Sequence, residues 1–181
     1  MITESFAQAL VNEDSDGEGI ACQFYRLTQD VGVKFYYNED NRDKSWALQT
    51  IGHALGVAPQ AYERFEVKIS DYDCLYGFAT EITVTVYDIL TAQLGFSPDG
   101  SWFDENEHGW YRHVDYNYIR NYIEDKFTSI GIDTADLHDK NVGFGPNGEL
   151  WCIDFSEFEI DTVLSWEEFV ARKLSQIKVK Q

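Results

Sequence analysis

Two short stretches in the second half of the chain carry side chains that can act together in chemistry. Asp136 is followed five residues later by Asn141, and thirteen residues after that by Asp154, which stands in an Ile-Asp-Phe-Ser run. An aspartate can orient a substrate hydroxyl, and asparagine and aspartate oxygens suit a hard cation such as Mg²⁺. Turn formation is the alternative explanation. However, the segment between Asn141 and Asp154 has the length of a β-hairpin that would bring them together.

A second group of residues, nearer the N-terminus, could hold phosphate groups. Gly17 and Gly19 stand in an acidic turn ahead of a predicted strand, and glycines allow a backbone to lie close over phosphates. Lys34 lies in an otherwise apolar strand, where its ammonium group needs a partner. An ordinary hairpin turn and an outward-facing lysine are the alternatives for these two features.

The elements that would position these residues are mostly strands in the first half of the chain and mostly helices in the second. Runs of β-branched and aromatic residues predict strands at 20–27, 31–37, 61–69, 75–86, 142–144 and 150–153. Apolar spacing and capping residues predict helices at 43–55, 87–94, 115–130 and 166–177, with a loop over 95–109. This order predicts an α+β fold with a boundary near residues 82–88, and a ligand cleft between the two parts.

The order and spacing of the motifs resemble those of the protein-kinase-like superfamily. The Asp-Leu-His-x-x-Asn stretch, residues 136–141, is most similar to the aminoglycoside-phosphotransferase and other atypical branches. The resemblance implies one structural unit with two lobes and a central cleft. Residues 1–82 would form an N-terminal antiparallel sheet with one helix, and residues 83–181 a truncated, mainly helical C-terminal lobe.

The resemblance also implies ATP and Mg²⁺ as cofactors and a role for each motif residue. Asp136 would orient the phosphoryl acceptor, and Lys34 would contact the α- and β-phosphates. Asn141 and Asp154 would bind Mg²⁺.

Further positions follow from the same resemblance. Gly17 and Gly19 would lie over the phosphates, in a Gly-x-Gly-x-x-Cys-x-Phe version of the glycine-rich loop. Backbone groups at Glu81 and Ile82 would meet adenine, and Asp88 would reach a ribose hydroxyl. A glutamate at a sheet end and a helix-capping aspartate are the alternatives for Glu81 and Asp88.

The chain departs from the family pattern in several places. The helix after the Lys34 strand lacks the expected glutamate, and Gln49 stands in its place. Glu39 or Asp43 could substitute only if the helix were shifted. Thr134 replaces the histidine of the His-x-Asp pattern, and Ser156 replaces the glycine of Asp-Phe-Gly. Only 25 residues follow Ser156, so a peptide-substrate groove is hard to build.

Composition limits the partners of the protein. The net charge of -18 disfavours direct binding to nucleic acids or anionic membranes. It fits solubility, a basic protein partner, or a surface that imitates DNA. The three cysteines are widely spaced, which predicts free thiols. No signal peptide or membrane-spanning run is visible in the sequence, so a cytoplasmic protein is expected.

Three hypotheses therefore arise from the sequence. The first is a minimal kinase-like phosphotransferase that acts on an unidentified acceptor. The second is a catalytically inactive pseudokinase that acts as an acidic interaction or inhibitor module. The third is an acidic DNA mimic, which only the net charge supports.

Overall fold

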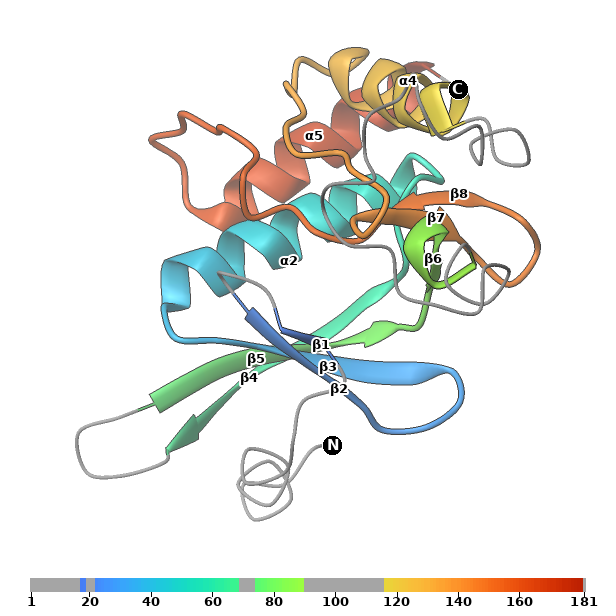
Figure 1. Cartoon of the computed structure of the whole chain (residues 1–181). Helices are drawn as coiled ribbons and strands as arrows, with labels where there is room; N and C mark the ends of the chain where they lie inside the picture. The colour runs from blue at the N-terminus through green and yellow to red at the C-terminus, as the bar shows by residue number, and fades with distance from the viewer. Residues whose placement is uncertain (1–16, 19–21, 69–73, 90–115, 181) are drawn as a thin grey trace.

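The computed structural model describes residues 17–18, 22–68, 74–89 and 116–180 and has a mixed α+β architecture (Figure 1). A five-stranded antiparallel sheet has the order β1-β2-β3-β5-β4. Its strands are β1 (Gly17–Glu18), β2 (Cys22–Arg26), β3 (Val31–Tyr36), β4 (Ala61–Lys68) and β5 (Cys74–Glu81). A three-stranded antiparallel sheet contains β6 (Val84–Thr85), β7 (Val142–Phe144) and β8 (Leu150–Cys152). The helices are α2 (Glu39–Ala54), α4 (Tyr116–Thr128) and α5 (Trp166–Lys180).

Helix α2 begins four residues earlier than the predicted start at residue 43. Asn38 is the N-cap, and its side chain accepts a hydrogen bond from the backbone of Asn41 at 3.2 Å. Glu39 and Asp40 then occupy the first turn, where acidic side chains interact favourably with the helix dipole. Gly56, with a φ of 77°, follows the helix end in the left-handed conformation that glycine adopts easily.

Helix α2 lies between the five-stranded sheet and the two later helices (Figure 1). Its apolar side chains, Ala47, Leu48 and Ile51, belong to one buried cluster with residues from α4, α5 and the segment after β8. Phe127 and Phe158 pack edge-to-face in that cluster, with ring centroids 5.4 Å apart. The N-terminal and C-terminal halves of the chain therefore share a hydrophobic core.

An ionic cluster near the start of α2 adds contacts between this helix, α5 and the five-stranded sheet. Arg64 of β4 pairs with Asp43 of α2 at 2.9 Å and with Glu167 of α5. Its guanidinium carbon lies 4.2 Å from the ring centroid of Trp46. The indole of Trp166 donates to Asp40 at 2.8 Å. Two helices and a strand are thus joined near the start of α2.

The prediction of one strand over residues 75–86 is wrong in its extent, because this segment forms two strands in two sheets. Strand β5 ends at Glu81, where the backbone N–H of Ile82 turns to donate to the carbonyl of Asp30 at 3.0 Å. The chain then enters the second sheet as β6, which pairs with β7. The β-branched run favours a strand but does not specify which sheet it joins.

The other predicted elements are present with small shifts at their ends. Helix α5 extends to Lys180, beyond the predicted end at residue 177. A helical turn occupies residues 86–89, and the rest of the helix expected over 87–94 and the loop expected over 95–109 lie outside the described residues. All three cysteines are free thiols, as predicted.

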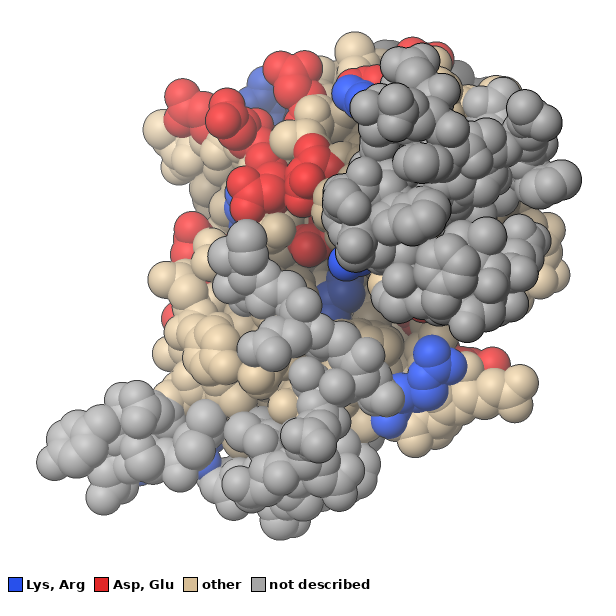
Figure 2. All heavy atoms as spheres, viewed as in Figure 1, with Lys and Arg blue, Asp and Glu red and all other residues tan. Residues whose placement is uncertain are grey.

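In the described part of the chain, no helix has the length and apolar character needed to cross a membrane. On the face in Figure 2, Asp and Glu side chains gather over the part that holds the helices. Lys and Arg side chains are visible below them, toward the five-stranded sheet.

Candidate functional site

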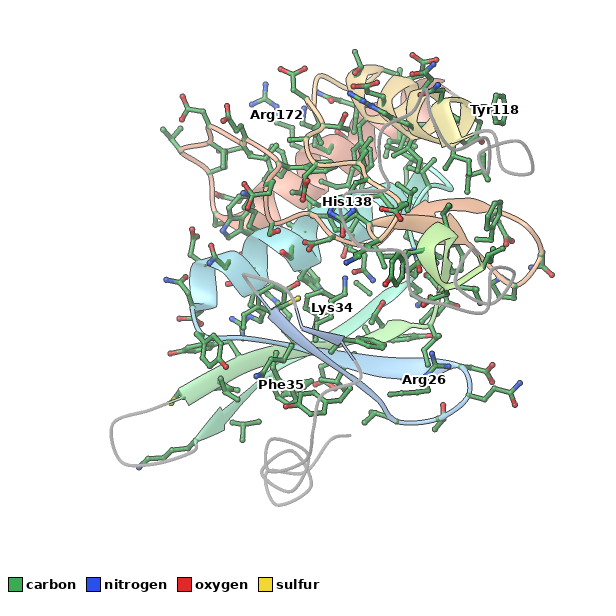
Figure 3. The ribbon with its side chains drawn as sticks, in the orientation of Figure 1. Arg26, Lys34, Phe35, Tyr118, His138 and Arg172 are labelled. Carbon is green, nitrogen blue, oxygen red and sulfur yellow. The ribbon has the colours of Figure 1, made fainter. Side chains whose placement is uncertain are left out.

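A cavity of about 550 Å³ lies between the five-stranded sheet and the loops that flank β7 and β8. Lys34 lines it from β3, while Asp136, Asn141 and Asp154 line it from the loops. Figure 3 shows Lys34 between the sheet and the loop that carries His138. The four residues that the sequence singles out for catalysis and metal binding therefore meet at one cavity.

The Lys34 side chain is held by neutral oxygen atoms. It is 7% exposed, and its ammonium group donates to Gln49 Oε1 at 3.1 Å and to the carbonyl of Ile153. The Gln49 amide in turn donates to the carbonyl of Pro59 at 3.2 Å and to Thr80 Oγ1 at 2.5 Å. Gln49 thus occupies the place where the family resemblance implies a glutamate.

The two acidic substitutes for that glutamate lie elsewhere. Glu39 and Asp43 pair with Arg42 at 3.0 Å and 2.6 Å. Both carboxylates therefore pair with Arg42 near the start of α2. Neither takes the place of the glutamate beside Lys34, where the side-chain partner is Gln49.

The loop before β7 fixes Asp136 and Asn141 relative to each other. Asp136 has a φ of 55°, a left-handed conformation that aspartate tolerates better than most residues. The side-chain amide of Asn141 donates to both the carbonyl and Oδ2 of Asp136, each at 3.0 Å. A non-glycine residue with positive φ in a cavity wall is typical of functional sites.

Asp154 is brought beside this pair by the β7–β8 hairpin. The backbone N–H of Ile153 donates to the carbonyl of Asn141 at 2.9 Å. Asp154 Oδ1 accepts the backbone N–H of Ser156 at 2.9 Å, and the carbonyl of Ser156 accepts from Lys44 at 2.8 Å. These bonds fix the loop on both sides of the carboxylate.

The side-chain oxygen atoms of Asn141 and Asp154 are suitable ligands for a magnesium ion. The Nδ2 of Asn141 is committed to Asp136, so its amide oxygen is the atom that can ligate a cation. One oxygen of Asp154 is used by Ser156, and its second oxygen, Oδ2, can serve as another ligand. Mg²⁺ is commonly held by one or two such oxygens together with waters and phosphate oxygens.

His138 stands next to Asp136 on the cavity wall. Its Nδ1 lies 3.6 Å from the carboxylate of Asp139, and its Nε2 lies 3.7 Å from Asp136. The nearby Asp139 carboxylate is the main cause that raises the pKa of His138, and burial opposes it. Asp139 itself is 2% exposed, and its backbone carbonyl accepts from Tyr87 at 3.1 Å.

Cys22 lines the cavity from β2, opposite Tyr36 and two positions along the strand from Phe24, the partner of Lys34. Burial raises the pKa of its thiol to about 11, and the nearby Lys34 charge only partly offsets this effect. The thiol is therefore protonated at neutral pH.

The remaining predicted nucleotide-binding residues have different placements. Gly17 lies in β1, and Gly19 lies outside the described residues. Glu81 and Asp88 both line the cavity, and Asp88 also caps the helical turn by accepting from Thr85 at 3.0 Å. Ile82 does not line the cavity.

The backbone groups predicted to meet adenine are already used within the protein. The N–H of Glu81 donates to Gln60 at 3.2 Å, and that of Ile82 donates to Asp30 at 3.0 Å. These two amides are thus committed to joining the end of β5 to neighbouring loops. That backbone groups at Glu81 and Ile82 meet adenine therefore stays a prediction, which would fall to atoms other than these two N–H groups.

Two residues of the site were missed by sequence reasoning. Thr80 lies on the cavity face of β5, where it binds Gln49. Lys44 holds the loop after Asp154 from helix α2. The alternation along β5 could have placed Thr80 on one face with Phe78, but no local signal connects Lys44 to Ser156.

Comparison with known proteins adds little to this geometry. No protein-family model matches the chain, and no curated protein sequence matches it. Among solved structures, a crystal structure of WbdD is similar with a TM-score of 0.47 and 15% sequence identity. The match covers 88% of this chain and only 37% of the WbdD chain. A likeness at this level assigns no family.

Proposed function

We propose that this chain is a small kinase-like phosphotransferase that binds ATP with Mg²⁺ and transfers a phosphoryl group to an acceptor. The observation that carries the proposal is the meeting of Lys34, Asp136, Asn141 and Asp154 at one cavity of about 550 Å³. Cavities of roughly 300 to 1,000 Å³ accommodate small ligands. In this proposal, residues 1–82 and 83–181 are the two lobes of a kinase-like fold.

Each residue has a role that its surroundings support. The Lys34 ammonium group, held at the inner end of the cavity, binds phosphate oxygens. Asp136, whose Oδ2 accepts from the Asn141 amide, orients the acceptor hydroxyl and takes its proton. Mg²⁺, when bound by Asn141 and Asp154, supplies charge neutralisation on the phosphates.

The experiment combines a binding and a turnover measurement. Calorimetry should detect ATP binding that requires Mg²⁺, and Lys34→Met and Asp154→Asn should each weaken it. Asp136→Asn should retain binding but lower ATP turnover about 100-fold or more. Asp133→Asn, an exposed position in the same segment, is the matched control. Absence of Mg·ATP binding by the wild-type protein would overturn the proposal.

A second candidate is a non-catalytic relative that acts through its acidic surface, for example on a basic protein. The neutral amide of Gln49 beside Lys34, where an acidic partner is expected, favours it. In this case the chain would bind ATP weakly or not at all, and no ATP turnover would depend on Asp136. The same pair of measurements therefore separates the two candidates.

A further inference from the structure

The face of the five-stranded sheet that points away from the cavity carries a second buried apolar cluster. Side chains alternate along a strand, so Val33 and Phe35 of β3 point to the side opposite Lys34. Figure 3 shows Phe35 on the far side of the sheet from Lys34. The buried members of this cluster, which we call the outer face, are Tyr25, Val33, Phe35, Val67 and Leu75.

Aromatic rings form the centre of the outer face. The Phe35 ring meets the Tyr25 ring edge-to-face with centroids 5.7 Å apart, and it meets the Phe65 ring at 5.6 Å. Gly77 of β5 is paired with both Phe35 and Phe65. A Cβ atom at Gly77 would lie 2.7 Å from the Phe65 ring. The glycine therefore lets this ring lie close to the sheet, beside Phe35.

The side chains of the outer face are buried more deeply than a single layer allows. Tyr25 is 3% exposed, Phe35 1% and Val33 0%. Rings that stand side by side on one sheet shield their edges from water, but their tips need a second layer. All helices of the described residues lie on the cavity side of the sheet (Figure 1). These exposures belong to a single copy of the chain, so the cover comes from the chain itself.

The longer segments outside the described residues differ in how easily they reach the outer face. Residues 69–73 close the hairpin between the paired Lys68 and Cys74, which leaves little chain to spare. Residues 90–115 connect the helical turn after β6 with α4, and both ends lie on the cavity side. Residues 1–16 end at β1, which pairs with β2 at the edge of the sheet. The N-terminal segment therefore starts nearest to the outer face.

The first twelve residues have the sequence pattern of an amphipathic helix. Ile2, Phe6 and Leu10 recur at every fourth position, and polar residues stand between them at positions 4, 8 and 12. At about 100° per residue, these two sets would lie on opposite sides of a helix. In a strand, where the side-chain period is two, both sets would share one face. The pattern thus supplies an apolar side only in the helical case.

The polar residues from Asn12 to Asp16 are long enough to connect such a helix to β1. Five extended residues span about 17 Å. Two strand spacings separate β1 from β3, which is about 10 Å, and a layer packed on a sheet lies roughly 10 Å from it. The connection can therefore pass round the sheet edge and bring residues 1–11 onto the outer face.

We propose that residues 1–11 dock as an amphipathic helix on the outer face, with Phe6 and Leu10 against the rings of Tyr25 and Phe35. The contact joins an aliphatic and aromatic stripe to an aromatic surface and buries no charge. It supports β2 and β3 from the side opposite the cavity that they line. The inference concerns this surface and does not depend on the proposed function.

Photo-crosslinking in the full chain tests the placement. Phe6→p-benzoylphenylalanine keeps an aromatic group at the proposed contact, and on irradiation its ketone carbon bonds to a neighbouring C–H carbon while the hydrogen moves to the ketone oxygen. Peptide mapping by mass spectrometry should find this bond within one chain, on β2, β3 or β5. The matched control, Gln8→p-benzoylphenylalanine, places the group on the polar side and should give about fivefold less of this product.

A second measurement removes the apolar contact. Phe6→Ser combined with Leu10→Ser should uncover the outer face and raise amide exchange in residues 22–36 about tenfold or more. It should also increase the fluorescence of anilinonaphthalene sulfonate, a dye that binds exposed apolar surface. Glu4→Ser combined with Gln8→Ser changes only the polar side and should leave both readouts unchanged. Circular dichroism checks that each variant is folded.

Several outcomes would overturn the proposal. These are crosslinks to α2, α4 or α5, crosslinks formed only between two chains, and a yield equal to that of the control at position 8. Unchanged exchange in residues 22–36 after loss of both apolar side chains would overturn it as well. If the crosslinks form as expected but the wild-type protein binds no Mg·ATP, the proposed function fails and this inference stands.

Discussion

Gln49 is the side-chain partner of Lys34, at the position where the family resemblance implies a glutamate. Its side-chain oxygen accepts from Lys34, while its nitrogen donates to Pro59 and Thr80. A carboxylate could perform the first task but has no N–H for the second. The amide is therefore suited to this fully buried position, where an unmet carbonyl acceptor is costly.

Gln49→Glu should consequently fail to improve the site. The new carboxylate would gain the Lys34 charge but would face the carbonyl of Pro59. We expect a loss of about 1 to 3 kcal/mol in the free energy of unfolding. Urea titration measures this loss, and Gln29→Glu adds the same charge at an exposed turn as a control. A Gln49→Glu protein as stable as wild type would contradict the argument.

Cys22 gives a prediction about pH. Burial raises the pKa of its thiol to about 11, so about one thiol in a thousand is ionised at pH 8. Because only the thiolate reacts, alkylation by iodoacetamide should be slow at pH 8. It should speed up about tenfold per pH unit toward pH 11. Peptide mapping separates Cys22 from Cys74, and a rate that reaches its plateau below pH 9 would contradict the prediction.

At the scale of elements, two lysines hold the segment that carries Asp154. Lys34 of β3 donates to the carbonyl of Ile153, and Lys44 of α2 donates to that of Ser156. The backbone N–H of Ser156 then binds the Asp154 carboxylate. Strand β3 and helix α2 thus set the position of a candidate metal ligand that neither of them contains.

Lys44→Met tests this coupling, since methionine keeps the apolar stem and removes the ammonium group. Loss of one charged hydrogen bond, worth about 1 kcal/mol at a partly exposed site, should raise amide exchange in residues 154–158 about fivefold. Hydrogen-exchange mass spectrometry measures this change. Lys126→Met is the matched control, because its ammonium group lies over the Tyr122 ring on α4. Equal exchange in the two variants would show that Lys44 does not hold the segment.

Elements were predictable where local patterns decide them. The hairpin from Asn141 to Asp154 was predictable from residues 136–154 alone, because its turn and strands are contiguous in the sequence. The start of α2 was missed because Asn38, Asn41 and Asp40 can all cap a helix. The β-branched run at 82–86 leaves the first sheet where the Ile82 N–H donates to the carbonyl of Asp30. Asp30 is far away in the sequence, so no local pattern indicates this contact.

At the scale of the whole molecule, the site depends on contacts that no local pattern contains. Lys34 and Ile153 are 119 residues apart, and only the completed fold joins them. The sequence could propose Lys34 and Asp154, the neighbour of Ile153, as parts of one site through a family resemblance. It could not provide the strand register that places Phe24 beside Lys34, or the lean of the Phe24 ring over Gly32.

The net charge of -18 is also a property of the whole molecule. Repulsion among like charges destabilises a compact state, and dissolved salt screens it. The exposed ion pairs that salt also weakens, such as Arg120 with Glu124, contribute little individually. The repulsive term should therefore dominate the response to salt.

We accordingly expect the melting temperature to rise by roughly 2 to 6 °C when NaCl increases from about 20 to 500 mM, equivalent to about 1 to 2 kcal/mol. A variant with Asp125→Asn, Asp133→Asn, Glu159→Gln and Asp161→Asn removes four exposed negative charges outside the cavity. Its melting temperature should be higher at low salt and should respond less to NaCl. Differential scanning calorimetry measures both. A melting temperature that falls with NaCl would mean that specific ion pairs, rather than the overall charge, govern the stability of this protein.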